Sequence, residues 1–159
     1  MVHFVGAGPG ATDLITLRGL KYLSEADVII YAGSLVNKDM LSYAKAEAEI
    51  YNSAHMTLEE VIDVVKKAEK ENKDTVRLHT GDPSIYGAIR EQIDVLKSLD
   101  INFDVVPGVS SFCGAAASLN AEYTLPDVSQ SVIITRMEGR TPVPERESIR
   151  SFAAHKSTM

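Results

Sequence analysis

The sequence contains few of the residues that mark disulfide-rich, disordered or membrane proteins. Its one cysteine, Cys113, excludes a disulfide within the chain, and its small apolar neighbours predict an inert thiol in the core. Tryptophan is absent and aromatic residues make up 6% of the chain, against 45% hydrophobic residues. This composition predicts a globular protein with an aliphatic core. With 159 residues, the chain is long enough to bury roughly 70% of its unfolded surface.

Runs of one charge sign and long apolar runs are also missing. The 16 basic and 22 acidic residues give a formal net charge of −6, and no stretch is rich in lysine and arginine. This balance argues against nucleic acid or an anionic membrane as the main partner. No apolar run approaches the roughly 20 residues that span a bilayer, and no basic segment precedes an apolar one at the N-terminus. We therefore expect a soluble, cytoplasmic protein.

Short β-forming runs alternate with helical patterns through the first two thirds of the chain. The third helical pattern opens with a capping box formed by Thr57 and Glu60. The alternation predicts an α/β fold, in which a five-stranded, mainly parallel sheet carries helices on both faces. The predicted strands are residues 2–5, 28–31, 49–52, 74–78 and 103–106, and the predicted helices are residues 14–26, 37–48, 57–71 and 84–99.

A change in composition predicts a domain boundary near residue 120. A small-residue helix is expected at 111–120, and it completes an N-terminal α/β domain at 1–120. Residues 121–130 contain proline, aspartate and serine and are interpreted as a linker. A strand at 131–135 and a helix at 144–154 follow, which are too little to close a core. We therefore interpret residues 131–159 as the beginning of a second, incomplete α/β domain.

Glycine-bearing turns follow four of the predicted strands, and the turn after residues 74–78 is the most informative. There Gly81 allows a close backbone approach, Pro83 presets a turn and Asp82 places a carboxylate at the start of a helix. Parallel strands end at one common edge, where open α/β sheets bind their ligands. The four turns are therefore expected to converge on a site. The alternative is a plain turn with a helix-capping acid.

The first glycine turn fits the loose dinucleotide pattern Gly-x-Gly-x-x-Ala between Gly6 and Ala11. Two features oppose a dinucleotide there. Pro9 has no backbone N–H to offer a pyrophosphate, and the acid expected about 20 residues later is missing, because residues 31–33 are Tyr-Ala-Gly. A dinucleotide-binding oxidoreductase domain remains the alternative enzyme class.

Other catalytic patterns are missing from the sequence. There is no Gly-Lys-Ser/Thr phosphate loop and no Gly-x-Ser-x-Gly elbow, and the four histidines share no ligand spacing. We predict no metal site and assign no catalytic residue. Ser110 and Ser111 are either helix caps or donors to a small molecule. Such a site binds and positions its ligand, which suits group transfer from a reactive cofactor.

Five ordered motifs resemble those of the tetrapyrrole (corrin/porphyrin) methyltransferases, which use S-adenosylmethionine. Within that family, residues 31–36 (YAGSLV) and 135–144 (TRMEGRTPVP) are similar to the members that methylate C11 of precorrin-4-type corrinoids in cobalamin biosynthesis. The five motifs are GAGPG (6–10), DLITLRG (13–19), ADVIIY (26–31), TGDPSIYG (80–87) and VPGVSS (106–111).

The resemblance implies a two-domain enzyme, a homodimer at full length, that holds S-adenosylmethionine between its domains. Asp82 would lie near the charged part of the cofactor, and Tyr86 would wall the pocket. The first glycine loop would face the macrocycle and not a phosphate. The implied cofactor-binding residues are Pro9, Gly81, Asp82, Ile85, Tyr86, Ser110 and Ser111.

The resemblance also implies a corrinoid substrate with many carboxylates. Arg136 and Arg140 are candidate partners, since guanidinium pairs with carboxylate in a fixed fork, although both arginines also suit an exposed surface. Gly8, Tyr31 and Ser34 are the other implied substrate contacts. Complete family members carry a full second domain, so we expect these 159 residues alone to be inactive. A non-catalytic α/β binding module, with residues 131–135 as an open edge, is the alternative outside enzymes.

Overall fold

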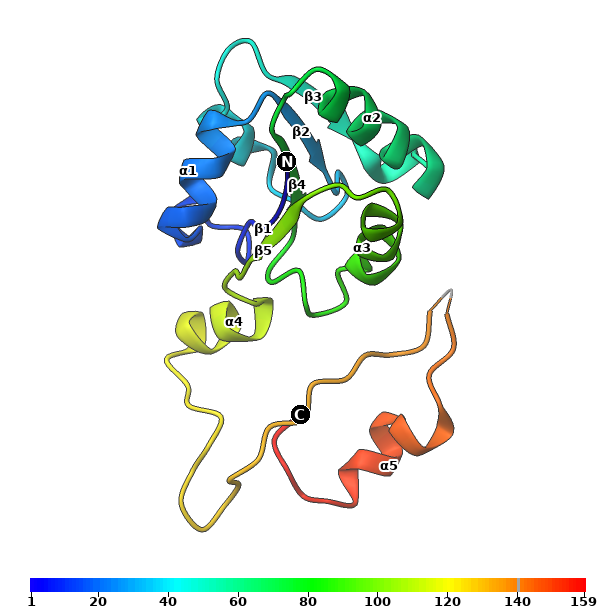
Figure 1. The fold of residues 1–159 in the computed structure, drawn as a ribbon. Coiled ribbons are helices and arrows are strands. Elements are labelled where there is room, and N and C mark those ends of the chain that lie inside the picture. The colour runs from blue at the N-terminus through cyan, green and yellow to red at the C-terminus, as the bar shows by residue number, and fades with distance from the viewer. Residues whose placement is uncertain (140) are drawn as a thin grey trace. The chain divides into compact units, whose positions relative to one another are not determined.

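A parallel sheet of five strands organises the first 114 residues (Figure 1). The computed structural model describes residues 1–139 and 141–159. The strand order is β3-β2-β4-β1-β5, and all neighbours run parallel, which confirms the predicted α/β sheet. The strands are β1 (Val2–Gly6), β2 (Val28–Tyr31), β3 (Glu49–Asn52), β4 (Thr75–His79) and β5 (Phe103–Val106).

Helices and 3-10 turns connect these strands. The α-helices are α1 (Leu17–Glu25), α2 (Leu58–Lys70), α3 (Ile89–Ser98), α4 (Ser111–Leu119) and α5 (Ile149–Ala153). The 3-10 helices are η1 (Thr12–Leu14), η2 (Lys38–Tyr43), η3 (Ser53–His55) and η4 (Glu145–Glu147). Within the described residues, no helix is both long and apolar enough to cross a bilayer.

Two hydrophobic cores lie on opposite faces of the sheet, because successive strand residues point to opposite sides. Val5 and Ile29 pack with α1 and η2, whereas Phe4 and Ile30 pack with α2 and α3. Figure 1 shows α1 on one side of the sheet and α2 and α3 on the other. Each fully buried aliphatic side chain contributes roughly 1.5–3 kcal/mol. The helices on both faces confirm that part of the prediction.

Local capping decides where the helices begin. At α2, Thr57 Oγ1 accepts from the Glu60 N–H at 3.3 Å and Glu60 Oε2 accepts from the Thr57 N–H at 2.7 Å, so the predicted capping box is confirmed. The first helix begins at Leu17 and not at residue 14, because Thr16 caps it through the Gly19 N–H. Leu17 consequently points outward and is 88% exposed.

Two further predicted helices differ in the structure, and so does the predicted environment of Cys113. The helix predicted at 37–48 is only the short η2, whose cap is Asn37. The helix predicted from residue 84 begins at Ile89, because a turn with positive φ at Tyr86 and Ala88 precedes it. Cys113 is exposed, so the predicted core thiol is wrong; α4, which carries it, buries none of its residues.

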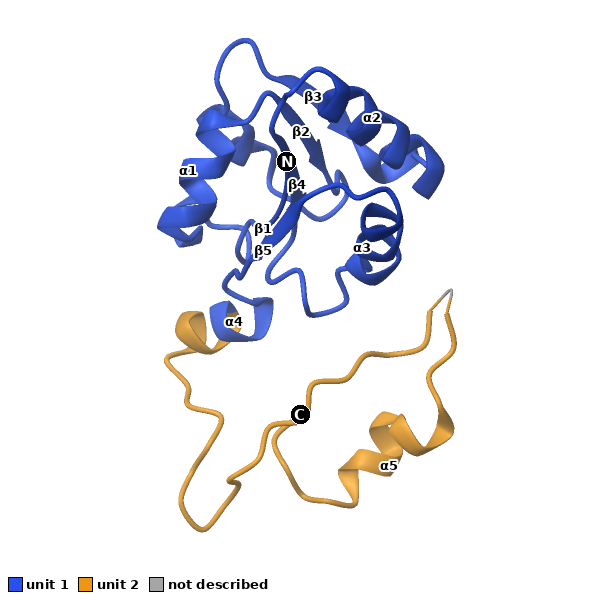
Figure 2. Ribbon diagram, viewed as in Figure 1, with its two compact units in different colours: residues 1–114 blue, residues 115–159 orange. Residues whose placement is uncertain are grey.

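Residues 115–159 form a second compact unit (Figure 2). It contains η4 and α5, both within the segment predicted as a helix at 144–154. The prediction of a strand at 131–135 is wrong. In this segment Val132 makes one isolated parallel bridge to Thr158. A strand requires a continuous ladder of backbone hydrogen bonds, and a single bridge does not provide one.

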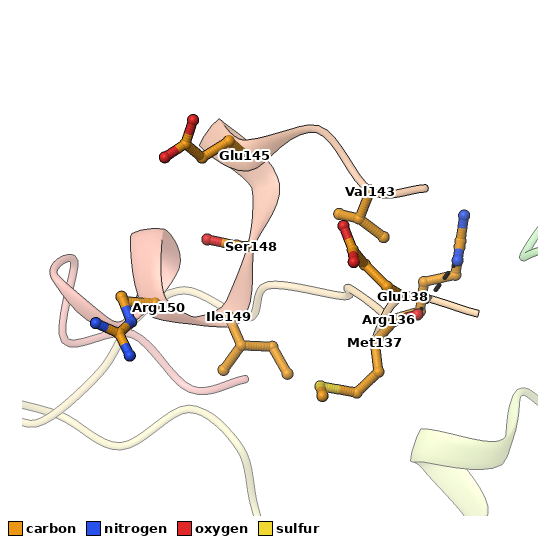
Figure 3. Close-up of a pocket in the computed structure, with 8 residues that line it drawn as sticks. All are labelled: Arg136, Met137, Glu138, Val143, Glu145, Ser148, Ile149 and Arg150. Atoms are coloured by element: carbon orange, nitrogen blue, oxygen red, sulfur yellow. Dashed lines mark hydrogen bonds between the residues drawn. The ribbon is translucent and has the colours of Figure 1, made fainter. Parts of the chain in front are cut away.

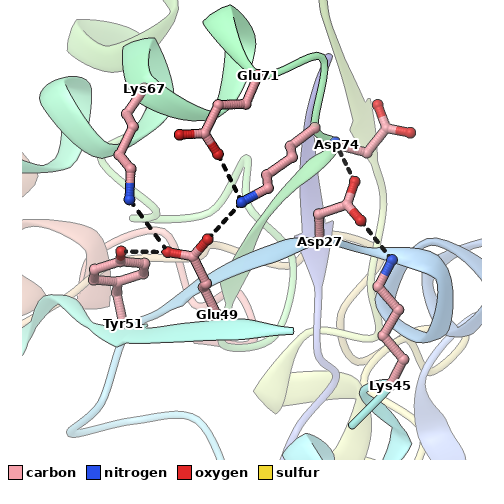
Figure 4. Close-up of polar contacts among 8 residues, drawn as sticks. Asp27, Lys45, Glu49, Tyr51, Lys67, Glu71 and Asp74 are labelled. Atoms are coloured by element: carbon pink, nitrogen blue, oxygen red, sulfur yellow. Dashed lines mark hydrogen bonds and ion pairs between the residues drawn. The ribbon is translucent and has the colours of Figure 1, made fainter. Parts of the chain in front are cut away.

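An ion network ties β3 to the loop that enters β4, around Glu49 (Figure 4). Lys73 Nζ lies 2.7 Å from Glu49 Oε1, and the Tyr51 hydroxyl donates to Glu49 Oε2 at 2.9 Å. Lys67 lies 3.6 Å from the same carboxylate. The hydrogen bond from Lys73, then the hydrogen bond from Tyr51 and the nearby charge of Lys67, lower the pKa of Glu49 from 4.5 to about 2.

Replacing Glu49 with glutamine is expected to lower the Tm by a few degrees at pH 7. Because the pKa of Glu49 is lower in the folded state, its stabilisation is present above pH 4.5 and is lost as the pH falls towards 2. The Tm difference between the two proteins should therefore shrink between pH 5 and pH 2. Asp63→Asn is the control, since Asp63 makes one exposed ion pair with Lys66. Equal Tm values at pH 7 would show that the network does not stabilise β3.

Candidate functional site

Three glycine turns meet at the carboxyl edge of the sheet, where β4 and β5 flank β1. Gly81 N–H donates to Gly8 O at 2.8 Å, and Gly8 N–H donates to Gly81 O at 3.3 Å. A Cβ on Gly6 would lie 2.5 Å from Gly81 O and 2.6 Å from Gly108 Cα. Only glycine allows these backbones to lie so close. We call Gly6, Gly8, Gly81 and Gly108 the glycine crossing.

Asp82 links the turn after β4 to the turn after β5. Its Oδ2 accepts from the Gly108 N–H at 3.0 Å, and its Oδ1 accepts from the Ser84 N–H at 2.8 Å. Its backbone carbonyl accepts from the Ile85 N–H at 3.1 Å. Hydrogen bonds to a carboxylate are stronger than neutral ones, at about 1.5–3 kcal/mol each. The Asp82 side chain therefore holds the two turns in register.

The turn between β4 and α3 is strained and exposes two large side chains. Tyr86 has φ 56° and Ala88 has φ 50°, a region that costs a residue with a Cβ about 1–2 kcal/mol. A Cβ on Gly87 would collide with Pro83 O. Ile85 is 39% exposed and Tyr86 is 61% exposed. Strain of this kind gathers at ligand sites, and here it presents apolar surface beside Asp82.

The start of α4 lies close to the same carboxyl edge of the sheet. A Cβ on Gly81 would lie 3.5 Å from Ser110 Cα and 3.6 Å from the Ser111 amide nitrogen. A Cβ on Gly114 would lie 2.7 Å from Pro9 Cβ, so the first turn packs against α4. The structure thus brings the predicted cofactor residues Pro9, Gly81, Ser110 and Ser111 together, with Asp82 between two of the turns.

The predicted substrate residues are more dispersed. Gly8 belongs to the glycine crossing, whereas Tyr31 is 7% exposed and packs in the core on the α1 face. Ser34 is exposed on the loop after β2. That loop reaches the first turn through Asn37, whose Nδ2 donates to Gly10 O at 2.9 Å. Arg140 lies outside the described residues.

Arg136 lies in the second unit, where its guanidinium holds its own loop together. Its Nη1 donates to Met137 O and Thr141 O, and its Nη2 donates to Thr141 Oγ1 at 2.8 Å and to Pro142 O. The side chain also lines an open cavity of about 420 Å³ (Figure 3). The cavity is lined by Arg136, Met137, Glu138, Val143, Glu145, Ser148, Ile149 and Arg150.

Two basic side chains are buried on β4, directly before the central turn. Burial lowers the pKa of Arg77 to about 10, and burial together with the Arg77 charge lowers the pKa of His79 to about 3. His79 Nε2 has no hydrogen-bond partner among residues 1–139 and 141–159. Sequence reasoning missed Arg77 and its partner Gln92; the signal was an arginine in the middle of a β-forming run. Among the described residues, no three His, Cys, Asp or Glu side chains gather closely enough to hold a metal.

The whole chain, residues 1–159, matches the family described as Tetrapyrrole (Corrin/Porphyrin) Methylases. It is 63% identical over 158 residues to a cobalt-precorrin-4 C(11)-methyltransferase of Methanocaldococcus jannaschii, covering 99% of this chain and 61% of that protein. It is 44% identical to a precorrin-4 C(11)-methyltransferase of Pseudomonas aeruginosa, over 99% of this chain and 63% of that protein. The chain thus spans less than two thirds of the length of these relatives.

Solved structures show the same architecture. The X-ray structure of a cobalt precorrin-4 methyltransferase matches with a TM-score of 0.94 at 49% identity, over 98% of this chain and 65% of that one. A uroporphyrin-III C-methyl transferase from Thermus thermophilus, complexed with S-adenyl homocysteine, matches with a TM-score of 0.68 at 30% identity. That match covers 82% of this chain and 53% of the other.

Proposed function

The chain belongs to the tetrapyrrole (corrin/porphyrin) methylase family, and we propose that it serves the transfer of a methyl group from S-adenosylmethionine to C11 of a precorrin-4-type corrinoid. The names of its relatives support this activity, and they name either cobalt-precorrin-4 or precorrin-4 as the substrate. The observation that carries the proposal is the convergence of the three glycine turns, fixed by Asp82, at the carboxyl edge of the sheet.

The residues at this edge fit the cofactor. The exposed side chains of Ile85 and Tyr86 would cover its adenosine, and Ser110 and Ser111 would offer hydroxyl and N–H donors to its polar groups. Pro9, Gly81 and Asp82 complete the proposed cofactor site. When bound, S-adenosylmethionine supplies a methyl group on a sulfonium to an electron-rich ring carbon. The protein's own task is then mainly to align the two reactants and exclude water, which accounts for much of the rate of such reactions.

The first turn is poorly suited to a dinucleotide. Ala7 N–H donates to His79 O at 2.7 Å, and Gly8 N–H donates to Gly81 O, so both donors are already engaged within the sheet edge. Pro9 has no N–H. Residues 7–9 therefore offer no free N–H to a pyrophosphate, which needs consecutive donors in such a turn. The oxidoreductase alternative is therefore disfavoured.

The corrinoid would lie on the other side of the methyl donor. Gly8, Tyr31, Ser34, Arg136 and Arg140 are the proposed substrate residues. Because Arg136 donates to several loop oxygens, its contribution would be to shape that loop as well as to attract carboxylates. We further propose a homodimer in the cytoplasm for the complete enzyme, with residues 131–159 as part of its second domain.

The test uses an extended form, in which these 159 residues are joined to the part of the Methanocaldococcus jannaschii relative that they do not match. S-adenosylmethionine with a ¹³C-methyl group and either cobalt-precorrin-4 or precorrin-4 are added, and NMR locates the new methyl group. We expect the label at C11 and none transferred by the 159-residue chain alone. Calorimetric binding of NAD without binding of S-adenosylhomocysteine would contradict the proposal. Binding of S-adenosylhomocysteine without transfer to either corrinoid would favour the non-catalytic module.

A further inference from the structure

A chain of three hydrogen bonds, two of them buried, connects the strained turn to the centre of the sheet. Arg77, on β4, is 8% exposed. Its Nη1 donates to Ile30 O on β2 at 3.0 Å, and its Nε donates to Gln92 Oε1 on α3 at 3.1 Å. Gln92 Nε2 in turn donates to Ala88 O at 3.2 Å. We call Arg77 and Gln92, with these three hydrogen bonds, the relay.

The relay is an unusual use of a buried cation. Its acceptors are a backbone carbonyl and an amide, and no ion pair to Arg77 occurs among the described residues. Burying a guanidinium without a counter-charge is costly, so hydrophobic residues of similar volume would serve a purely structural role at least as well. The feature that distinguishes this arginine is its geometry: it fixes the Gln92 side chain in one orientation.

The fixed orientation of the Gln92 side chain stabilises the turn that precedes α3. Ala88 is the last turn residue and the N-cap of α3, and it has a positive φ with no side-chain cap. Without an external contact, nothing in the local sequence favours this conformation over an ordinary helix start. Gln92, which is itself 8% exposed, donates to the Ala88 carbonyl. The turn that it holds carries Ile85 and Tyr86, both exposed beside Asp82.

We propose that Arg77 and Gln92 are positioning residues that hold the 83–88 turn in its strained conformation, so that Ile85 and Tyr86 are preset to bind the methyl donor. The identity of the ligand rests on the proposed function. The inference that the relay holds the 83–88 turn does not depend on that function. Neither residue touches the reacting atoms. Their effect is to remove the cost of ordering the turn when the ligand binds.

The test separates the two links of the relay. Gln92→Glu keeps an acceptor for Arg77, and adds a charge partner, but removes the donor to Ala88 O. The Tm should therefore stay the same or rise, while the exchange rate of the amides at 84–88 rises about fivefold in the 159-residue chain. The affinity of the extended form for S-adenosylhomocysteine should fall by a similar factor. Gln92→Met removes both links and should lower the Tm as well.

Arg90→Ala is the matched control, since Arg90 lies on the same helix and makes one exposed ion pair with Asp94. Arg90→Ala should change neither the amide exchange at 84–88 nor the affinity for S-adenosylhomocysteine. Unchanged exchange at 84–88 in Gln92→Glu would overturn the inference, as would a rise in exchange spread evenly over the sheet. If the unsubstituted extended form fails to bind S-adenosylhomocysteine, the proposed function fails, and the exchange experiment still decides whether the relay holds the turn.

Discussion

Replacing Gly108 with alanine is expected to destabilise the first unit by more than about 3 kcal/mol and to abolish binding of S-adenosylhomocysteine. A Cβ on this residue would collide with Gly81 O and lie 2.8 Å from Gly6 Cα. Both neighbours are backbone atoms of turns that β1 and β4 fix in place, so no side-chain rotation relieves the clash. Urea unfolding followed by circular dichroism measures the loss, and calorimetry with the extended form measures binding.

Two other glycines provide the controls for Gly108→Ala. Gly139 has open space around its Cβ position and no positive φ, so Gly139→Ala should leave stability unchanged. Gly10 also has open space but a φ of 121°, so Gly10→Ala should cost only the backbone strain, about 1–3 kcal/mol. If Gly108→Ala lowers the free energy of unfolding no more than Gly10→Ala does, the turns do not approach one another as closely as the structure indicates.

Replacing Asp82 with alanine is expected to reduce the affinity for S-adenosylhomocysteine about thirtyfold. The substitution removes the acceptor of the Gly108 and Ser84 N–H groups, so the turns after β4 and β5 lose their shared carboxylate. Loss of about 2 kcal/mol of charge-assisted hydrogen bonding accounts for this factor. Calorimetry with the extended form gives the affinity, and the KM for S-adenosylmethionine should rise in parallel.

The affinity of Asp82→Asn for S-adenosylhomocysteine should lie between those of the wild type and Asp82→Ala. The asparagine oxygen can accept from one of the two N–H groups, but the asparagine NH₂ then faces the other N–H group and cannot accept from it. Asp94→Ala removes an exposed carboxylate from α3 and serves as the control. Wild-type affinity in Asp82→Ala would show that the carboxylate neither contacts the ligand nor sets the turns that bind it.

Most of the first unit could be predicted from local patterns. The run at 28–31 is continuously apolar because β2 is buried on both faces, and the Thr57–Glu60 capping box places the start of α2. The start of α3 could not be predicted, since Ser84 is an adequate helix residue. The helix nevertheless begins only at Ile89, because Gly87 packs against the Pro83 carbonyl and Ala88 takes a positive φ.

The candidate site was partly predictable for a related reason. Glycine and Asp-Pro signals mark the ends of strands, and parallel strands end at one edge, so Gly81 and Ser110 were expected together. The partners of Asp82 depend on which turn lies beside it, which the sheet order decides and no local pattern contains. Arg77 was overlooked because a strand interior is an unusual place for an arginine, and its partner Gln92 lies on a different element.

On the proposed function, the turns at the carboxyl edge of the sheet hold a methyl donor. The most direct measurement is a ¹H–¹⁵N NMR titration of the extended form with S-adenosylhomocysteine. We expect amide shifts to concentrate at residues 80–87 and 108–113, and the same titration of Asp82→Ala to show them only at much higher ligand concentration. Shifts confined to residues away from both segments, or shifts at residues 6–11 with NAD alone, would contradict it.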